Sequence, residues 1–300
     1  MFNLKLPSAL QKVDHPLLRK VDCELWVKRD DLIHPEISGN KWRKLALNIK
    51  EAEQKGFSKV LTFGGAYSNH IAATAAIAGI SNLEFHAMIR GEELNPNSNY
   101  CLQKANEQGL NLHFISRSDY AELKSIKDWS RMGEEWKDTY IIPEGGGNEL
   151  GVRGCEEIYN EIELAFDHLY CAAGTGTTAA GILRSLKGEK LHIVSALKGG
   201  GFLKEEILKW QTKKEKKHQI ELIEDYHFGG FGKVTEELVD FQESCKTEWG
   251  LELDYLYTSK AFFALVELLK KEHFPAKSRI VFYHSGGLQG NRGIREHKSQ

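Results

Sequence analysis

Strand-like and helix-like segments alternate along this chain from residue 59 onward, and the alternation restricts the folds open to it. Short runs rich in apolar and β-branched residues, such as KVLTFGG at 59–65, are each followed by a longer amphipathic or alanine-rich stretch, such as SNHIAATAAIAG at 68–79. Strands joined through helices pair in parallel, because a parallel connection has to cross over the sheet. The pattern therefore predicts open parallel sheets with helices on their faces.

Two series of this kind follow one another, separated by a glycine cluster at 145–147. We therefore predict an α/β fold made of two doubly wound open-sheet domains. The smaller domain is expected over residues 46–142, and the larger domain over residues 1–45 and 143–300. In such sheets ligands bind beyond the carboxyl ends of the strands, so the loops that follow strands are the candidate sites.

The composition argues against several classes of function. The formal net charge is −2 and the pI is near 6.6, so the whole chain has no electrostatic attraction to nucleic acid or to an anionic membrane. No run approaches the ~18 apolar residues of a membrane span. No signal peptide is recognisable either, and we expect a cytoplasmic protein. The five cysteines form no C-x-x-C pair and the histidines no H-E-x-x-H motif, so we expect no metal.

The segment AAGTGTTAAG at 172–181 lies between a predicted strand and a predicted helix. Glycines and hydroxyl residues at such a junction can aim several backbone N–H groups at a phosphate on the helix N-terminus. A tight turn that needs glycine only for its backbone angles is the alternative. The candidate phosphate ligands are Gly174, Thr175, Gly176, Thr177 and Thr178.

The same segment also matches G-x-G-x-x-A over residues 174–179, which is the fingerprint of a nicotinamide dinucleotide site. That site requires an acidic residue about twenty positions further on, to bind the ribose hydroxyls. The following strand ends in Ser195, Ala196, Leu197 and Lys198, with no carboxylate. A different phosphate ligand is therefore favoured over a nicotinamide cofactor.

The segment GGAYSNH at 64–70 offers a hydroxyl, an amide and an imidazole in consecutive residues. It does not match the G-x-S-x-G elbow of serine hydrolases, because no second glycine follows Ser68. Ser68 and Asn69 could cap the following helix, bind a ligand, or do both. For His70, packing in the core and a role as a base remain equal alternatives.

The segment ISGNKWRKL at 37–45 opens a predicted helix whose apolar residues recur at three-and-four spacing. At about 100° per residue, Lys41 and Lys44 lie roughly 60° apart and leave the helix on the same side. Two lysines there could hold an anion, and one of them could bind an aldehyde.

Taken together, SGNKWRKL, FGGAYSNH, AAGTGTT, LYTSKAFFAL and YHSGG occur in this order along essentially the whole chain. In this combination the chain is similar to the pyridoxal-phosphate enzymes of the 1-aminocyclopropane-1-carboxylate deaminase and D-cysteine desulfhydrase family. That family has the tryptophan synthase β-like fold, in which the larger domain binds the cofactor. The resemblance implies pyridoxal 5′-phosphate as cofactor and a small amino acid as substrate. It also implies a homodimer.

The resemblance assigns roles to the residues that match the motifs. Lys41 aligns with the lysine that binds the cofactor aldehyde and then moves the substrate α-proton. Lys44 and the 174–178 loop match the groups that bind the phosphate. Asn69 matches the partner of the ring hydroxyl and Ser68 that of the substrate carboxylate. Tyr257 matches a tyrosine that handles a proton or the leaving group; without the resemblance, a core aromatic is the better interpretation of Tyr257.

Two further positions bear on the choice of reaction. Thr258 stands where the ring-opening deaminases have a glutamate against the pyridine nitrogen, and a neutral hydroxyl makes the ring a weaker electron sink. This favours β-elimination, in which a good leaving group carries away the charge. Phe231 stands near a position where the family carries a tyrosine, so a different small amino acid is also a candidate substrate.

The sequence therefore predicts a lyase that removes the α-proton, eliminates the β-substituent and releases ammonia and a 2-oxo acid, with D-cysteine as the leading substrate. The alternative within the class is 1-aminocyclopropane-1-carboxylate deaminase. From another class, the alternative is a non-catalytic relative that binds an amino acid without converting it.

Overall fold

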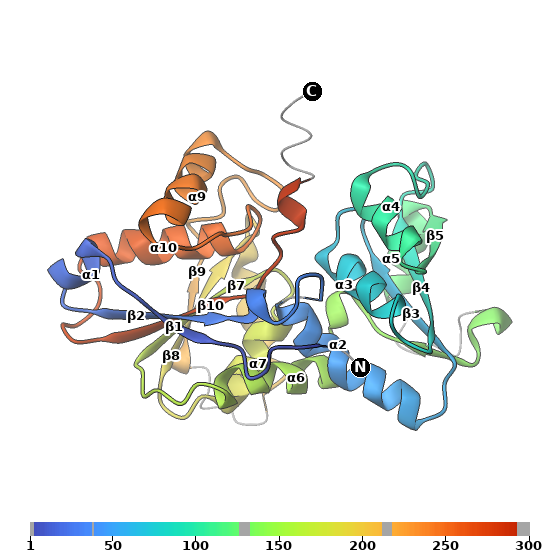
Figure 1. Ribbon diagram of the computed structural model, residues 1–300, viewed down its shortest axis with the longest axis horizontal. Helices are drawn as coiled ribbons and strands as arrows, with labels where there is room; N and C mark the ends of the chain where they lie inside the picture. Colours follow the sequence, from blue (N-terminus) through green and yellow to red (C-terminus); the bar gives the residue numbers. More distant parts are fainter. Residues whose placement is uncertain (1–2, 38, 126–132, 212–217, 293–300) are drawn as a thin grey trace. The chain divides into compact units, whose positions relative to one another are not determined.

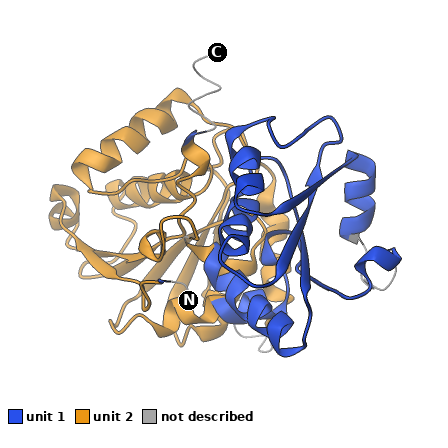
Figure 2. Ribbon diagram, turned by 45° about the vertical axis from the view of Figure 1, so that its right-hand side comes forward, with its two compact units in different colours: residues 1–3, 41–154, 292–300 blue, residues 4–40, 155–291 orange. Residues whose placement is uncertain are grey.

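The computed structural model describes residues 3–37, 39–125, 133–211 and 218–292, and it divides into two compact units (Figures 1 and 2). Unit 1 consists of residues 41–154 with the terminal pieces 1–3 and 292–300, and unit 2 of residues 4–40 and 155–291. Unit 1 thus extends beyond the predicted 46–142 at both ends, and it includes Lys41. The domain boundaries derived from the sequence remain a prediction. Ser38, which could cap the helix that follows it, lies outside the described residues.

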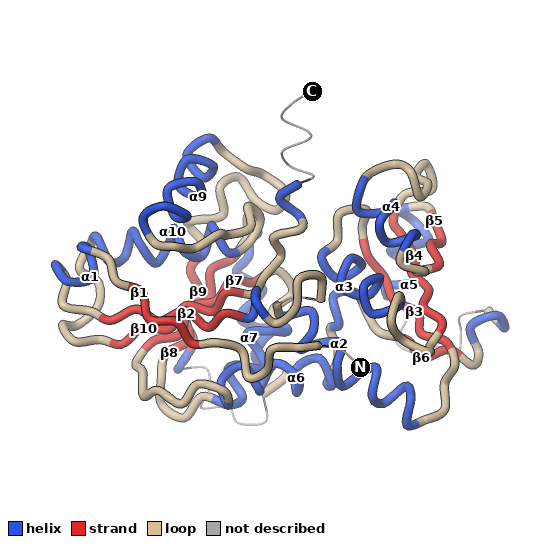
Figure 3. Tube along the Cα trace, in the orientation of Figure 1, coloured by secondary structure: helices blue, strands red, loops and turns tan. Residues whose placement is uncertain are grey.

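Unit 1 contains a four-stranded parallel sheet in the order β5-β4-β3-β6 (Figure 3). Its strands are β3 (Lys59–Gly64), β4 (Glu84–Arg90), β5 (Asn111–Ile115) and β6 (Thr139–Ile141). Its helices are α2 (Asn40–Gln54), α3 (Asn69–Ala78), α4 (Tyr100–Glu107) and α5 (Arg117–Ser125), followed by the short turns η3 (Glu134–Trp136) and η4 (Glu144–Gly146) and by α6 (Glu149–Asn160), whose last residues belong to unit 2. The chain winds from β3 outward to β5 and then returns to the other side of β3. The strand order therefore reverses between β3 and β6.

Unit 2 contains a six-stranded sheet in the order β1-β2-β10-β7-β8-β9, in which only the β1–β2 pair is antiparallel. Its strands are β1 (Leu10–Val13), β2 (Glu24–Arg29), β7 (His168–Ala173), β8 (Lys190–Ser195), β9 (Ile220–Ile223) and β10 (Arg279–His284). Its helices are α1 (Pro16–Lys20), α7 (Thr177–Ser185), α8 (Leu203–Leu208), α9 (Glu236–Glu248) and α10 (Thr258–Lys270), with short turns η1 (Asp30–Leu32) and η5 (Gly200–Phe202). Here the strand order reverses between β7 and β10. Both units are doubly wound, as predicted.

Helix α10 shows how the core of unit 2 fixes a candidate site. Its residues Phe262, Leu265 and Leu269 recur at three-and-four spacing and are completely buried, and the Phe262 ring lies 5.0 Å from the Phe282 ring of β10. Each such side chain contributes roughly 1.5–3 kcal/mol by leaving water. Helix α10 lies on one face of the sheet and α7 on the other (Figure 1). These contacts pack α10, which begins at Thr258, against the strands.

In unit 1, α5 packs on the sheet through Tyr120, which joins a buried cluster with Leu61, Phe63 and Met88. Helix α3 consists mainly of alanine and other small residues, so it can approach the strands and α4 closely. No helix within the described ranges is both long enough and apolar enough to cross a membrane.

Candidate active site

The four loops that stand out in the sequence lie at the two places where strand order reverses. In unit 1 they follow β3 and β6, at residues 64–70 and 143–151. In unit 2 they follow β7 and β10, at residues 172–181 and 283–290. Reversal of strand order leaves a crevice at the carboxyl ends of the two strands, because the flanking helices depart to opposite faces. The topology therefore makes these loops the candidate binding loops.

The loop after β7 ends in a helix N-terminus without a side-chain cap. Gly176 is the N-cap of α7, has a φ of +80°, and has no side chain to accept a hydrogen bond from the first turn. Thr177 and Thr178 are buried in that turn, and the hydroxyls of Thr175 and Thr177 lie 3.2 Å apart. The first N–H groups of a helix have no partner within it, so this end can bind an anion.

Tyr257 covers the start of the same loop. A side-chain carbon added at Gly174 would lie 3.0 Å from Cε1 of Tyr257 and 3.3 Å from its hydroxyl oxygen, so glycine permits this close approach. The ring of Phe231 lies 5.9 Å from the Tyr257 ring and is 55% exposed. Within unit 2, three of the regions predicted to carry function, at Gly174, Phe231 and Tyr257, therefore lie together.

Thr258 is completely buried and its hydroxyl is bound on two sides by Asp254. The hydroxyl donates to Oδ1 of Asp254 at 2.6 Å and accepts from the Asp254 backbone N–H at 2.8 Å. The other carboxylate oxygen of Asp254 accepts from the N–H groups of Leu256 and Tyr257. Because a hydroxyl has one hydrogen, Thr258 can only accept a hydrogen bond from any further group.

Lys260 holds the turn that carries Phe231. Its side chain is buried in the first turn of α10, and Nζ donates to the carbonyl oxygens of His227 and Gly230, both at 2.9 Å. Burial lowers the pKa of Lys260 to about 8, opposed by the carboxylate of Asp254. No role was predicted for this lysine. It stands on the same helical face as the buried Ala264, four residues later, and that spacing is the signal that could have marked Lys260 as buried.

In unit 1, the two predicted lysines occupy the first turns of α2. Lys41 is half-buried, whereas Lys44 is 2% exposed. Gly146, in the loop after β6, has a φ of +69°, and a side-chain carbon added there would lie 2.8 Å from Cβ of Lys44. This glycine lets the loop pack directly on the Lys44 stem.

The β3 loop carries the other predicted residues of unit 1. Ser68 caps α3, accepting from the N–H groups of His70 and Ile71 at 3.2 and 3.4 Å. Asn69 is the half-buried first residue of α3. Nε2 of His70 lies 2.7 Å from the Thr62 hydroxyl. Burial, and then the positive charges of Lys41 and Lys44, lower the pKa of His70 well below its usual value, so the imidazole is neutral.

Asn40, the last residue of the N-terminal segment of unit 2, bonds to both candidate loops of that unit. Its side-chain amide donates to the Thr178 hydroxyl at 2.9 Å, and its backbone N–H donates to the Ser285 carbonyl oxygen at 3.2 Å. The preceding Gly39 has a φ of +68°, and an added side-chain carbon would lie 1.8 Å from the Ser285 oxygen. Lys41 therefore directly follows Asn40, which is bonded to the N-terminal turn of α7. The sequence motifs assign Asn40 no role in bonding to these loops.

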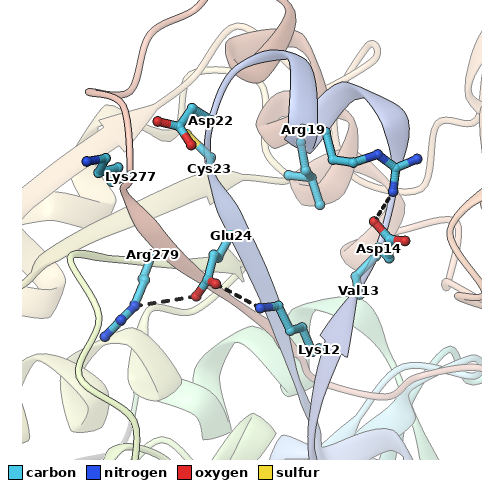
Figure 4. A pocket seen from close by; sticks show the side chains of 10 residues that line it. Lys12, Val13, Asp14, Arg19, Asp22, Cys23, Glu24, Lys277 and Arg279 are labelled. Atoms are coloured by element: carbon cyan, nitrogen blue, oxygen red, sulfur yellow. Dashed lines mark hydrogen bonds and ion pairs between the residues drawn. The ribbon is translucent and has the colours of Figure 1, made fainter.

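A separate surface pocket of about 410 Å³ lies elsewhere (Figure 4). It is lined at the amino ends of β2 and β10, where Glu24 pairs with Lys12 at 2.7 Å and with Arg279 at 3.4 Å. It contains none of the predicted site residues. Among the described residues, no group of three or more His, Cys, Asp or Glu side chains could hold a metal ion.

Comparison with known proteins identifies the family. The family model described as pyridoxal-phosphate dependent enzyme matches residues 9–286, which span both units. The chain belongs to this family of pyridoxal-phosphate dependent enzymes. Its cofactor is therefore pyridoxal phosphate, as the sequence predicted.

Named relatives support the same conclusion. The chain is 32% identical to the bifunctional D-cysteine desulfhydrase/1-aminocyclopropane-1-carboxylate deaminase, mitochondrial, of Arabidopsis thaliana, over 95% of this chain and 77% of that protein. It is 27% identical to the D-cysteine desulfhydrase of Klebsiella pneumoniae, over 88% of this chain and 87% of that protein. A solved structure of an ACC deaminase homologue matches with a TM-score of 0.82 and 27% identity, over 100% of this chain and 96% of that chain.

The residues present fit the pyridoxal-phosphate cofactor of this family. The uncapped terminus of α7 suits a phosphate, and the lysine pair in the first turns of α2 offers an amine for an aldehyde. Nδ1 of the buried His70 has no hydrogen-bond partner in the part of the chain that the structure describes, so the helix that follows the β3 loop of unit 1 holds a buried polar atom that could receive one. When bound, the pyridine ring of the cofactor withdraws electrons from the α-carbon of an amino acid.

Proposed function

We propose that this pyridoxal-phosphate enzyme acts as a D-cysteine desulfhydrase-like lyase. It would remove the α-proton of D-cysteine and eliminate the thiol as sulfide. One water molecule would then hydrolyse the released enamine, by way of its imine, to pyruvate and ammonia. The observation that carries the proposal is the bond from Asn40 to Thr178, because it joins the residue before Lys41 to the uncapped N-terminus of α7, where the phosphate is proposed to bind. The names of the plant and bacterial relatives support the choice of substrate.

Lys41 is proposed to bind the cofactor aldehyde through Nζ and to accept the α-proton when the amino acid has displaced it. The loop Gly174, Thr175, Gly176, Thr177 and Thr178 would bind the phosphate, assisted by Lys44. Lys44 is held by packing against Gly146, which suits a fixed point charge rather than a moving base.

Asn69 is proposed to bind the ring hydroxyl, and Ser68 the substrate carboxylate. Both lie at the N-terminus of α3, where a negative group is stabilised by the helix dipole. Tyr257 is proposed to handle a proton or the leaving group, and its close approach to Gly174 supports a place beside the cofactor.

Thr258 is proposed to contact the pyridine nitrogen. Because its hydrogen is donated to Asp254, it could accept a hydrogen bond from a protonated nitrogen but could not donate to a neutral one. A neutral acceptor holds a proton on that nitrogen less strongly than a carboxylate would. The pyridine ring would then withdraw electrons less strongly than it does opposite a carboxylate, which suits elimination of a good leaving group.

The experiment is a substrate panel with cofactor-loaded protein, using D-cysteine, L-cysteine and 1-aminocyclopropane-1-carboxylate, with sulfide and 2-oxo acid as readouts. D-cysteine should give the highest kcat/KM. Lys41→Ala should lower kcat by about 10²–10⁴ or more. The exposed Lys50 on the same helix supplies the control, and Lys50→Ala should be unchanged.

Different results would favour the alternatives. Release of 2-oxo acid from the cyclopropane substrate alone would identify a deaminase, which the name of the plant relative also includes. Cofactor binding without conversion of any substrate would favour the non-catalytic relative suggested by Phe231. A Lys41→Ala variant with full turnover would refute the proposed mechanism. We further propose a cytoplasmic homodimer, whose size light scattering would test.

A further inference from the structure

Lys260 is a buried cation at a position that does not favour one. Its side chain is completely buried in the first turn of α10, where the partial positive charge of the helix N-terminus opposes a lysine. Burial lowers the pKa of Lys260 to about 8, because the charged form is less stable there than in water. An apolar side chain would serve packing alone, as Ala264 does four residues later. What the amine contributes therefore lies in its hydrogen bonds.

The turn that Lys260 binds has a backbone of high conformational cost. The angle φ is positive at Phe228 (+51°), Gly229 (+89°), Gly230 (+111°) and Gly232 (+75°). A positive φ is unfavourable for phenylalanine, and glycine loses more conformational freedom than any other residue when it becomes ordered. Such a segment keeps one conformation only when the surrounding structure holds it there.

Two carbonyl oxygens of this turn serve a double purpose. The His227 oxygen accepts from the Gly230 N–H at 3.0 Å, and the Gly230 oxygen accepts from the Lys233 N–H at 3.2 Å. Each of these oxygens also accepts from Nζ of Lys260, at 2.9 Å. Hydrogen bonds from a charged donor are stronger than those between neutral groups. The atoms that close the turn are therefore also the atoms that attach it to α10.

The attachment determines where Phe231 lies. Phe231 directly follows Gly230, and its ring lies 5.9 Å from the ring of Tyr257, which precedes the first turn of α10. Because the Phe231 side chain is 55% exposed, its own packing holds the ring only in part. The position of the ring against Tyr257 therefore depends on the bonds from Lys260 to the turn.

We propose that Lys260 is a positioning residue that holds the Phe231 ring against Tyr257, and that these two rings limit the size of the β-substituent that the site accepts. The inference rests on the proposed function, in which Tyr257 lies beside the cofactor. A ring on an attached turn excludes a larger substituent, whereas a ring on a detached turn can move aside. A well-formed pocket discriminates one additional carbon by about 10–200-fold. D-Cysteine should therefore be converted in preference to S-methyl-D-cysteine.

The first test locates the Phe231 ring without turnover. Apoprotein is prepared with 4-fluorophenylalanine in place of Phe231, and its ¹⁹F resonance is compared in the otherwise wild-type protein, Lys260→Met and Lys260→Arg. Methionine keeps an unbranched apolar side chain but donates no hydrogen bond, whereas arginine keeps the charge and the donors. The resonance should move toward that of the unfolded protein in Lys260→Met, and should move less in Lys260→Arg.

The matched control is Lys270→Met. Lys270 belongs to the same helix but is exposed, and its Nζ lies 2.8 Å from the Glu267 carboxylate. This variant should leave the ¹⁹F resonance unchanged. In the cofactor-loaded enzyme, Lys260→Met should reduce the kcat/KM preference for D-cysteine over S-methyl-D-cysteine by about 3–10-fold, and Lys270→Met should not change it.

A ¹⁹F resonance identical with and without the Lys260 amine would overturn the proposal, as would an unchanged substrate preference in Lys260→Met. If neither Lys260 variant folds, wild-type apoprotein labelled with ¹⁵N-lysine decides. The proposal then requires a lysine ammonium group that is protected from exchange and has nuclear Overhauser contacts to residues 227–230, and their absence would contradict it. Failure of the proposed function would instead appear as no conversion of either amino acid, with the ¹⁹F results intact.

Discussion

The two units repeat one topology but equip it with different chemistry. In each, the strand order reverses beside the first strand of the winding, between β3 and β6 in unit 1 and between β7 and β10 in unit 2. The unit 1 loop after β3 presents side chains, Ser68, Asn69 and His70, whereas the unit 2 loop after β7 presents glycines, hydroxyls and an uncapped helix end. The strand order thus determines where the candidate loops lie, and the residues of each loop determine which chemical groups it presents.

If unit 1 supplies the reacting groups and unit 2 the phosphate-binding groups, variants should separate accordingly. Changes in the unit 2 loop should reduce cofactor affinity, and changes in the unit 1 loop should reduce turnover while the cofactor remains bound. The largest expected effect on stability is the response of unit 2 to acid.

Each sheet contains a histidine pair on neighbouring strands. Nδ1 of His86 lies 3.0 Å from Nε2 of His113 in unit 1, and Nδ1 of His168 lies 2.9 Å from Nε2 of His192 in unit 2. Burial lowers the pKa of His192 to about 3. Glu221 lies 3.2 Å from Nδ1 of His192, but its side chain is 37% exposed, so solvent weakens its effect and burial dominates.

We predict that unit 2 loses stability as the pH falls below about 6.5. The folded pKa of His192 is below the unfolded value, so the unfolded state binds more protons between these two pKa values and stability falls with falling pH. At pH 4.5 the loss should be about 3 kcal/mol relative to neutral pH. Hydrogen exchange resolved by peptide, with urea titrations at both pH values, measures it.

His192→Phe provides the matching variant, because a phenyl ring can keep the stacking on Tyr170, whose ring lies 4.3 Å away. Its stability should depend less on pH between 4.5 and 7 than that of wild type. Equal pH dependence in the two proteins would show that another group controls the acid sensitivity.

The fold and the binding loops were accessible from the sequence because each is encoded locally. The alternation of strand-like and helix-like runs predicts parallel pairing of the strands. The glycines that predict the loop after β7 all lie within a ten-residue segment. The bond from Asn40 to Thr178 joins residues 138 positions apart, and that from Lys260 to His227 joins residues 33 apart. The hydrophobic periodicity of the sequence does not indicate such long-range pairs, because they form only when whole helices and strands pack together.

The role of Asp254 could not be predicted from the sequence for the same reason. Asp254 lies three residues before Tyr257, the N-cap of α10, and only the buried hydroxyl of Thr258 shows that its carboxylate fixes the direction of a hydrogen bond. The role predicted for Thr258 came from a family motif, but the partner that limits this role came from three-dimensional packing.

A middle-sized effect is expected at Gly176, which tests the phosphate-binding role of unit 2. Alanine there would adopt a φ of +80° and place Cβ 2.8 Å from Cγ1 of Ile207. Strain and displacement of the loop should cost about 1–3 kcal/mol and lower cofactor affinity by about tenfold or more. Titration of apoprotein with pyridoxal phosphate, followed by absorption, measures it.

Gly188→Ala is the control, because nothing lies within 4 Å of an added side-chain carbon and its φ is not positive. It should bind the cofactor like wild type. If Gly176→Ala bound pyridoxal phosphate with unchanged affinity but turned over substrate more slowly, the proposed phosphate-binding role of unit 2 would be contradicted.

The smallest effect on stability is expected from Ser68→Ala in unit 1, and it separates capping from substrate binding. The two hydrogen bonds that Ser68 accepts are long, so their loss should cost about 0.5–1 kcal/mol. Asn99→Ala removes a comparable cap from α4, where the side chain accepts from the Leu102 N–H at 3.0 Å. Both variants should unfold at slightly lower temperature than wild type, but only Ser68→Ala should raise KM for D-cysteine. If the two variants retain equal kcat/KM, Ser68 is a helix cap and the substrate carboxylate is bound by other groups.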